Sequence, residues 1–235
     1  MFRAAGASVA GPGHVQSGQP NQDALSLRGW QGGWIAAIAD GLGSKPFSSQ
    51  GARWAVQCAQ RVLRHPDWSH ASDRDVVSAI YRRWLSGVSA IDPGSGAATL
   101  LIAACQADGR VRLFQIGDGL ILVRTASGIQ VITPDRTGFG NQTAALGVTR
   151  SWSSWTTASV QLRQPGDLVL LMTDGISDDV DACHLEDFAV TVRRELAKRT
   201  RRGCRSWLRH EMTHWATPGH SDDKTMAMIF KDGVA

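Results

Sequence analysis

Apolar segments of a few residues, separated by very short turns, recur through most of this sequence. The segments at residues 111–116 and 120–124 are separated only by Gly117-Asp118-Gly119. Three residues can close a hairpin, but they cannot form the crossover of a dozen or more residues that parallel strands need. The pattern therefore predicts antiparallel sheet, with further strands at residues 34–39, 98–104, 129–132, 167–173 and 225–230 and one that begins at Ala24.

Segments with helical periodicity separate these strands. Apolar residues recur every three or four positions in residues 51–63 and 73–91, and Ser72 or Asp73 is expected to cap the second helix. Residues 184–215 predict one or two more helices with a break near Gly203, and residues 134–147 predict a loop. This order of elements indicates an α+β fold. Without a visible linker or repeat, residues 1–235 are expected to form a single domain.

Composition limits the class of protein. Hydrophobic residues make up 43% of the chain and charged residues 20%, which is typical of a globular protein. No apolar run approaches the roughly 20 residues of a membrane-spanning helix. The four cysteines are widely spaced and include no Cys-x-x-Cys pair. We therefore expect a cytoplasmic protein with no membrane association, no disulfide framework and no structural zinc site.

The net charge of +4 comes from one segment of the chain. Residues 192–210 contain eight basic residues and one acidic residue, so the rest of the sequence is slightly acidic. Such a local excess argues against a general nucleic-acid-binding surface. We favour a solvated helix face for this segment; docking of an acidic partner or a phosphorylated tail is the alternative.

Aspartate recurs where the apolar segments end. Four strand–turn junctions carry it, as Asp-Gly or Asp-Asp pairs, and a further Asp precedes the strand at Ala24. A single Asp-Gly pair is most often only a turn, but converging strand ends would bring three or more carboxylates together. Like charges so close require a cation, and the hard ions Mg²⁺ and Mn²⁺ prefer oxygen ligands. The pattern therefore predicts a divalent metal site built from Asp23, Asp40, Asp118, Asp174 and Asp222.

Six short motifs follow one another along nearly the whole chain. They are Gly11-Pro12-Gly13-His14 with Gln19-Pro20-Asn21-Gln22-Asp23, Ala39-Asp40-Gly41-Leu42-Gly43-Ser44, Ser95-Gly96-Ala97-Ala98-Thr99-Leu100, Ile116-Gly117-Asp118-Gly119, Thr173-Asp174-Gly175-Ile176-Ser177-Asp178 and Ser221-Asp222-Asp223-Lys224-Thr225. In this order they resemble the metal-dependent protein phosphatases of the PPM (type 2C) family, in particular a compact bacterial branch. The resemblance implies a four-layer αββα sandwich, in which two antiparallel sheets are flanked by helix pairs.

The resemblance also implies a serine/threonine protein phosphatase. Members of the family hydrolyse phosphoserine and phosphothreonine with a water that two Mg²⁺ or Mn²⁺ ions activate, so no nucleophilic Cys or Ser is needed. By position, Asp40 would bridge both ions and Asp23 would hold a metal-bound water. The remaining matches to the family's ligands are the Gly41 carbonyl, Asp174 and Asp222, with Asp118 and Asp178 at a third-metal site. Expected partners are a phosphorylated protein substrate and a bacterial Ser/Thr kinase that the enzyme opposes; we expect a monomer.

Three positions depart from the family pattern. Gly18 stands where many relatives carry a phosphate-binding Arg, Leu42 where some carry a His, and Gln22 replaces a Glu. None of the three is an expected metal ligand, so the departures concern substrate binding and rate. They keep open an alternative function, a catalytically weakened PPM-like module that acts as a regulatory binding protein.

Two residues are candidates to bind the substrate phosphate in place of the missing Arg. Lys45 follows the motif that contains Asp40, and His14 belongs to the opening motif. A phosphate dianion needs donors beyond the metal ions. We favour His14, which the turn at residues 11–13 positions and which relatives without the Arg tend to carry, and we place it with Asp23 and Asp40 among the expected catalytic residues.

Overall fold

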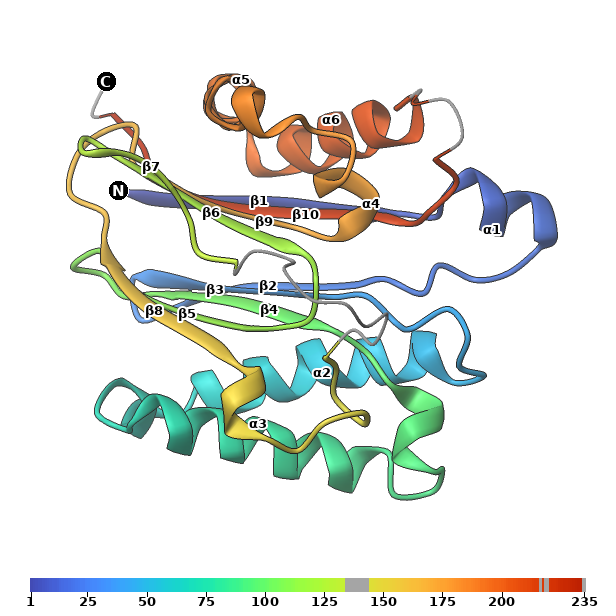
Figure 1. Cartoon of the computed structure of the whole chain (residues 1–235). Helices are drawn as coiled ribbons and strands as arrows, with labels where there is room; N and C mark the ends of the chain where they lie inside the picture. The colour runs from blue at the N-terminus through green and yellow to red at the C-terminus, as the bar shows by residue number, and fades with distance from the viewer. Residues whose placement is uncertain (134–143, 216, 218–219, 234–235) are drawn as a thin grey trace.

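The computed structural model describes residues 1–133, 144–215, 217 and 220–233, and these contain two five-stranded antiparallel sheets (Figure 1). The first sheet has the order β1-β10-β9-β6-β7, with β1 (Phe2–Val9), β10 (Lys224–Lys231), β9 (Leu168–Met172), β6 (Leu120–Thr125) and β7 (Gly128–Val131). The second has the order β2-β3-β4-β5-β8, with β2 (Ala24–Trp30), β3 (Gly33–Ala39), β4 (Leu100–Cys105), β5 (Arg110–Ile116) and β8 (Thr156–Gln161). The prediction of antiparallel sheet is confirmed. The hairpin expected across Gly117-Asp118-Gly119 is wrong, because these three residues lead from β5 in one sheet to β6 in the other.

Helix pairs cover the two outer faces of the stacked sheets (Figure 1). Helices α2 (Ser48–Leu63) and α3 (Asp73–Gly87) pack on the second sheet, and α5 (Leu185–Ala197) and α6 (Arg201–Thr213) pack on the first. Two short helices, α1 (Pro12–Ser17) and α4 (Asp174–Ser177), lie at one end of the sheets. The fold is therefore the α+β, four-layer αββα sandwich that the resemblance implied. Within the described residues, no helix combines the length and apolar character needed to cross a membrane.

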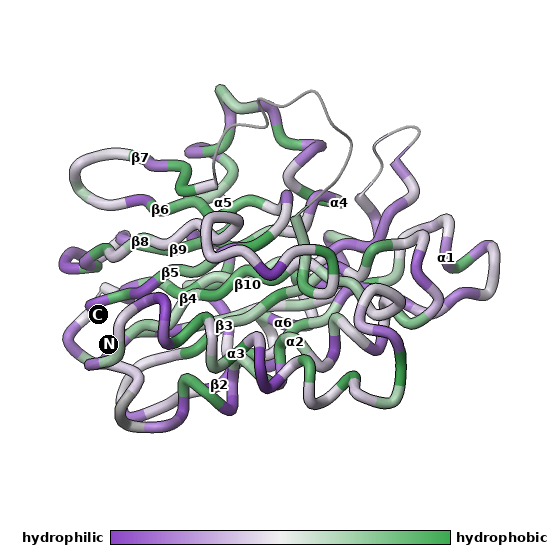
Figure 2. The backbone as a smooth tube through the Cα atoms, turned by 60° about the horizontal axis from the view of Figure 1, so that its bottom comes forward, coloured by the Kyte–Doolittle hydropathy of each residue, from purple (hydrophilic) through white to green (hydrophobic). Residues whose placement is uncertain are grey.

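Alternation along the strands builds three apolar layers. In β3, Ile38 packs between the sheets, whereas its neighbours Ala37 and Ala39 face the layer under α2 and α3. All three side chains are inaccessible to solvent, and full burial of a residue such as Ile38 contributes about 1.5–3 kcal/mol. Figure 2 shows the resulting pattern, with hydrophobic residues along the central strands and hydrophilic residues concentrated in the turns. Both ends of the sandwich are thus left to polar loops.

The structure differs from the predicted elements in several further places, including helix α1, where the sequence predicted only a turn. Strand β1 was not predicted, because its small residues lack a clear pattern; it forms through pairing with β10 along its whole length. The C-terminal helical segment breaks between α5 and α6 rather than at Gly203. Thr200 is the N-cap of α6, and its hydroxyl accepts a hydrogen bond from the Gly203 N–H at 3.3 Å. Most of the predicted loop at 134–147 lies outside the described residues.

Candidate active site

Strand register brings the predicted aspartates to one end of the sandwich. In the second sheet, Ala24 pairs with Ala39. Asp23 precedes the first of these residues and Asp40 follows the second, so the two carboxylates extend from neighbouring strands at the same edge.

The first sheet contributes the other aspartates by the same principle. Leu120 pairs with Met172, and Met172 pairs with Met226 on its other side. The start of β6, the end of β9 and the start of β10 therefore meet at one edge. Four carboxylates from the two sheets line one cleft of about 650 Å³, namely Asp40, Asp118, Asp174 and Asp222.

Burial and mutual repulsion oppose ionisation of these carboxylates. Loss of hydration, followed by the charges of Asp23 and Asp174, raises the pKa of Asp40 to about 10. Burial raises the pKa of Asp23 to about 7. Burial, with the charges of Asp118 and Asp222, raises the pKa of Asp174 to about 6. A divalent cation would remove this penalty, and a cluster of carboxylate oxygens is the donor set that Mg²⁺ and Mn²⁺ prefer.

Buried threonines hold the two central aspartates in place. The Thr173 hydroxyl donates to Asp23 Oδ2 at 2.9 Å and accepts from the Thr225 N–H at 3.1 Å. The Asp40 N–H donates to Thr99 Oγ1 at 2.9 Å. All three threonines are at most 2% exposed. Their role is not evident from the sequence, where their only signal is their position inside three of the quoted motifs.

The Asp223 carboxylate binds backbone N–H groups and does not line the cleft. Its Oδ1 accepts from the Gly11 N–H at 2.7 Å, and its Oδ2 accepts from the Gln22 N–H at 2.6 Å. A Cβ on Gly11 would overlap the Asp222 carbonyl, so no larger residue fits there. Asp223 thereby fixes both ends of the segment that carries α1 and leads into Asp23.

The two candidate phosphate-binding residues differ in position. Lys45 is half-buried and lines the cleft. His14 is not among the residues that line the cleft; its Nδ1 lies 2.9 Å from Asp223 Oδ2, without hydrogen-bond geometry. Gly18, at the position of the missing Arg, is the exposed C-cap of α1 with φ of 68°, a conformation that favours glycine.

The remaining predicted site residues flank the cleft. Gly41 is buried, and a Cβ there would lie 2.5 Å from the backbone carbon of Ser48, so the close approach to α2 requires glycine. Asp178 is exposed at the C-cap of α4, and its charge contributes to the raised pKa of Asp174.

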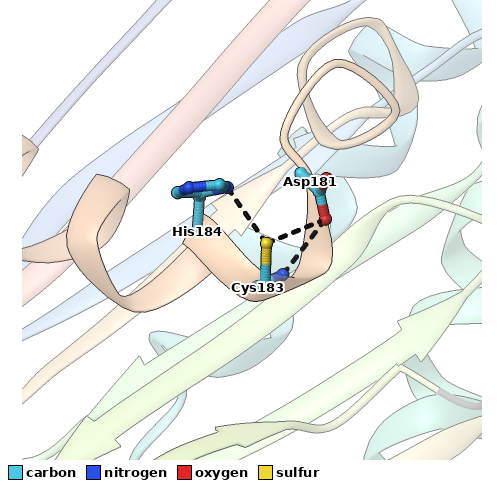
Figure 3. Close-up of side chains that lie close together, drawn as sticks. All are labelled: Asp181, Cys183 and His184. Atoms are coloured by element: carbon cyan, nitrogen blue, oxygen red, sulfur yellow. Dashed lines mark hydrogen bonds between the residues drawn. The ribbon is translucent and has the colours of Figure 1, made fainter.

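A second group of side chains with metal-binding chemistry lies outside the cleft (Figure 3). The donor atoms of Asp181, Cys183 and His184 lie within 4.8 Å of one another, and all three residues are exposed. Cys183 Sγ is 3.3 Å from Asp181 Oδ1 and 3.1 Å from His184 Nδ1. Asp181 also caps the 3₁₀ turn Ala182–His184 by accepting from the Cys183 N–H at 3.2 Å. This turn is separate from the carboxylate cluster, whose donors are oxygens alone.

Comparisons with known proteins agree with the observed fold. The family model described as protein phosphatase 2C matches residues 10–215. Among solved structures, the Mycobacterium tuberculosis serine/threonine phosphatase PstP/Ppp is 18% identical, with 99% of each chain covered and a TM-score of 0.70. PppA of Pseudomonas aeruginosa is 20% identical, with 97% of each chain covered and a TM-score of 0.67. The PP2C phosphatase domain of Bacillus subtilis SpoIIE, solved with a fragment of its regulatory domain, is 17% identical, with a TM-score of 0.63 over all of this chain and 65% of the other.

A search of curated protein sequences gives no match to the chain. The family model, however, extends over most of the sequence and includes the segments that carry Asp23, Asp40, Asp118 and Asp174. These segments fold into the stacked sheets that place those carboxylates at one edge. The solved structures share the overall fold. On the sequence match and the shared fold together, this chain belongs to the protein phosphatase 2C family.

Proposed function

We propose that this chain is a phosphatase that depends on Mg²⁺ or Mn²⁺ and hydrolyses phosphoserine and phosphothreonine in proteins, in opposition to a bacterial Ser/Thr kinase. The observation that carries the proposal is the convergence of four carboxylates on one cleft. Burial and mutual charge raise the pKa of two of the aspartates at this site well above their usual values. Further support comes from the catalytic domain of the serine/threonine phosphatase PstP, a solved relative that contains two manganese ions.

Each group of residues has a role in this proposal. Asp40, Asp174 and Asp222 would hold two ions, together with the Gly41 carbonyl, and Asp118 and Asp178 would add oxygens for a third. Ions bound there would supply Lewis acidity and neutralise the charge of the phosphate. Asp23 lies behind Asp40, held by Thr173, and would orient the attacking water by accepting a hydrogen bond from it. No covalent intermediate on the protein is required.

The first test is hydrolysis of p-nitrophenyl phosphate with added Mn²⁺, with and without a chelator. We expect turnover that the chelator abolishes and that excess Mn²⁺ restores, because a bound divalent cation would offset the burial and mutual repulsion of the carboxylates. A phosphoserine peptide and a phosphotyrosine peptide of the same sequence then test substrate class. Turnover that persists in the chelator would contradict the metal-dependent proposal.

The second candidate function is a weakened, regulatory member of the family that binds another protein. Gly18 favours it, because the exposed C-cap of α1 supplies no cation for the substrate phosphate. The two candidates separate in one experiment. A regulatory module is expected to bind Mn²⁺ in calorimetry without turnover of p-nitrophenyl phosphate or phosphopeptide. A phosphatase is expected to bind Mn²⁺ and to hydrolyse substrate.

We propose further that Lys45, rather than His14, binds the substrate phosphate. Its half-buried position on the cleft wall supports this assignment, whereas His14 contacts Asp223. Lys45→Ala is expected to lower kcat/KM at least about tenfold, which corresponds to about 1.4 kcal/mol, mainly through KM. Mn²⁺ affinity in calorimetry should be unchanged.

Lys45→Arg is the matched variant, because it keeps the positive charge and should retain most of the activity. His14→Ala is expected to change kcat/KM less than Lys45→Ala does. The reverse order, with Lys45→Ala silent and His14→Ala impaired, would return the assignment to His14. If neither variant loses activity, no side chain has replaced the missing Arg.

A further inference from the structure

A groove of about 340 Å³ lies between the outer edges of the two sheets, apart from the acidic cleft. Strands β1 and β2 are the terminal strands of their sheets, so each has a side with no neighbouring strand. The groove is lined by backbone and side chains of residues 4–6 and 25–28 and by two residues of α6, Arg201 and Arg205. It shares no lining residue with the cleft that contains Asp40.

Several arginines of the protein form ion pairs, but the arginines that line this groove do not. Arg3 lies 3.1 Å from Asp232, and Arg199 lies 2.8 Å from Glu195. By contrast, Arg28, Arg201 and Arg205 are exposed, and no carboxylate of the described residues forms an ion pair with them. Three positive charges therefore face one groove without compensation from the described part of the chain.

Packing holds one of these arginines at the groove. The Arg201 guanidinium lies 5.3 Å from the centre of the Trp34 ring. Trp34 itself donates from Nε1 to the Phe2 carbonyl at 3.0 Å, which links β3 of the second sheet to the edge strand β1 of the first. Beside it, Leu25 and Leu27 pack against the core between the sheets. The groove thus combines an apolar floor, backbone of two edge strands and a fixed cation.

We propose that this groove binds an acidic, extended segment of a partner protein. An edge strand offers unpaired backbone N–H and C=O groups, which an extended polypeptide can pair with. The three arginines would select carboxylate or phosphoryl side chains on that segment. A second copy of this chain is a poor occupant, because edge-to-edge association would bring the arginine clusters together.

The basic segment, which the sequence predicts to be a single solvated helix face, is divided in the structure. Arg201 and Arg205 are one helical turn apart, and both line the groove, whereas Arg202 and Arg209 are exposed on α6 and do not. Arg199 is engaged with Glu195 and lies over the Trp207 ring. Only part of the basic segment therefore belongs to the docking surface, together with Arg28 from a distant part of the sequence.

The test is binding of a fluorescein-labelled peptide of ten glutamates, followed by fluorescence anisotropy in low salt without added metal. We expect Arg28→Gln/Arg205→Gln to weaken binding about tenfold or more, because two of the three groove charges are lost. The matched control Arg202→Gln/Arg209→Gln removes the same charge from α6 outside the groove, and its effect should stay within about threefold. Thermal unfolding checks that both variants fold.

Hydrogen exchange supplies a second readout that a diffuse electrostatic attraction would not produce. Bound peptide is expected to protect backbone amides within residues 4–6 or 25–28. Equal loss of binding in the two double variants, no binding by the natural sequence, or binding without protection at either edge would overturn the proposal. The arginines would then serve only to prevent edge-to-edge aggregation. Because the experiment needs neither metal nor turnover, its outcome is independent of the proposed phosphatase activity.

Discussion

Asp40→Asn is expected to lower Mn²⁺-dependent hydrolysis of p-nitrophenyl phosphate by at least about 100-fold. Even mutation of groups that only orient metal ligands costs about 10–100-fold in metal affinity or activity. Asp40 lines the cleft, and the charges of Asp23, Asp174 and Asp222 all act on it. An amide there keeps the shape of the side chain but removes the charge that binds a cation. Asp174→Asn should have an effect of the same kind, and far-ultraviolet circular dichroism should show an unchanged fold.

The control for this experiment is Asp187→Asn, which removes the same charge from an exposed position in the first turn of α5. It should leave turnover within about twofold of the natural protein. Turnover within a few-fold of normal in both Asp40→Asn and Asp174→Asn would rule out the carboxylate cluster as the metal site. Loss of turnover in only one of the two variants would show that the other aspartate is not an essential metal ligand.

Asp40→Asn is also expected to stabilise the metal-free protein. Burial raises the pKa of Asp23 to about 7 and that of Asp40 to about 10, whereas an unfolded Asp titrates near 3.9. The folded state therefore binds more protons than the unfolded state above about pH 4. The free energy of unfolding contributed by these groups falls as pH rises from about 4 through about 7, and for Asp40 it continues to fall toward about 10.

Asn cannot ionise, so the free energy of unfolding should fall less with rising pH in Asp40→Asn than in the natural protein. At pH 8 in chelator, we expect the variant to be more stable by at least about 1 kcal/mol, or about 2–4 °C in Tm. The advantage should shrink at pH 5 and reverse when Mn²⁺ is added, because only the natural cluster gains from the cation. Scanning calorimetry at the two pH values, with Asp187→Asn as the charge control, measures the difference. Equal Tm values of Asp40→Asn and the natural protein at pH 8 without metal would show that the buried Asp40 carboxylate does not destabilise the fold.

Local patterns in the sequence were sufficient to predict most of the fold. The short connection at Gly117-Asp118-Gly119 indicated antiparallel sheet, which the fold contains, but the hairpin expected there does not form, because β5 and β6 belong to different sheets. Ser72 caps α3 as expected, with its side chain accepting from the Asp75 N–H. Such features depend on residues a few positions apart, so a single sequence is enough to recognise them. The position of aspartate at strand ends is equally local, which is why the candidate ligands could be named.

Contacts between distant segments could not be predicted in this way. Strand β1 exists because Phe2 to Val9 pair with Lys231 to Lys224 across the whole length of the chain. Asp223 belongs to the closing motif, but only the fold shows that its carboxylate accepts hydrogen bonds from the N–H groups of Gly11 and Gln22.

Both Lys45 and His14 were candidates from their place in the sequence. Only the fold shows that Lys45 lines the cleft, whereas His14 lies beside Asp223. Arg28 joins Arg201 and Arg205 only because β2 and α6 meet at one edge of the sandwich. The sequence alone therefore determined which residue types end the strands. Topology and register decided which of those residues meet, since the packing that brings remote segments together leaves no periodic trace in either segment.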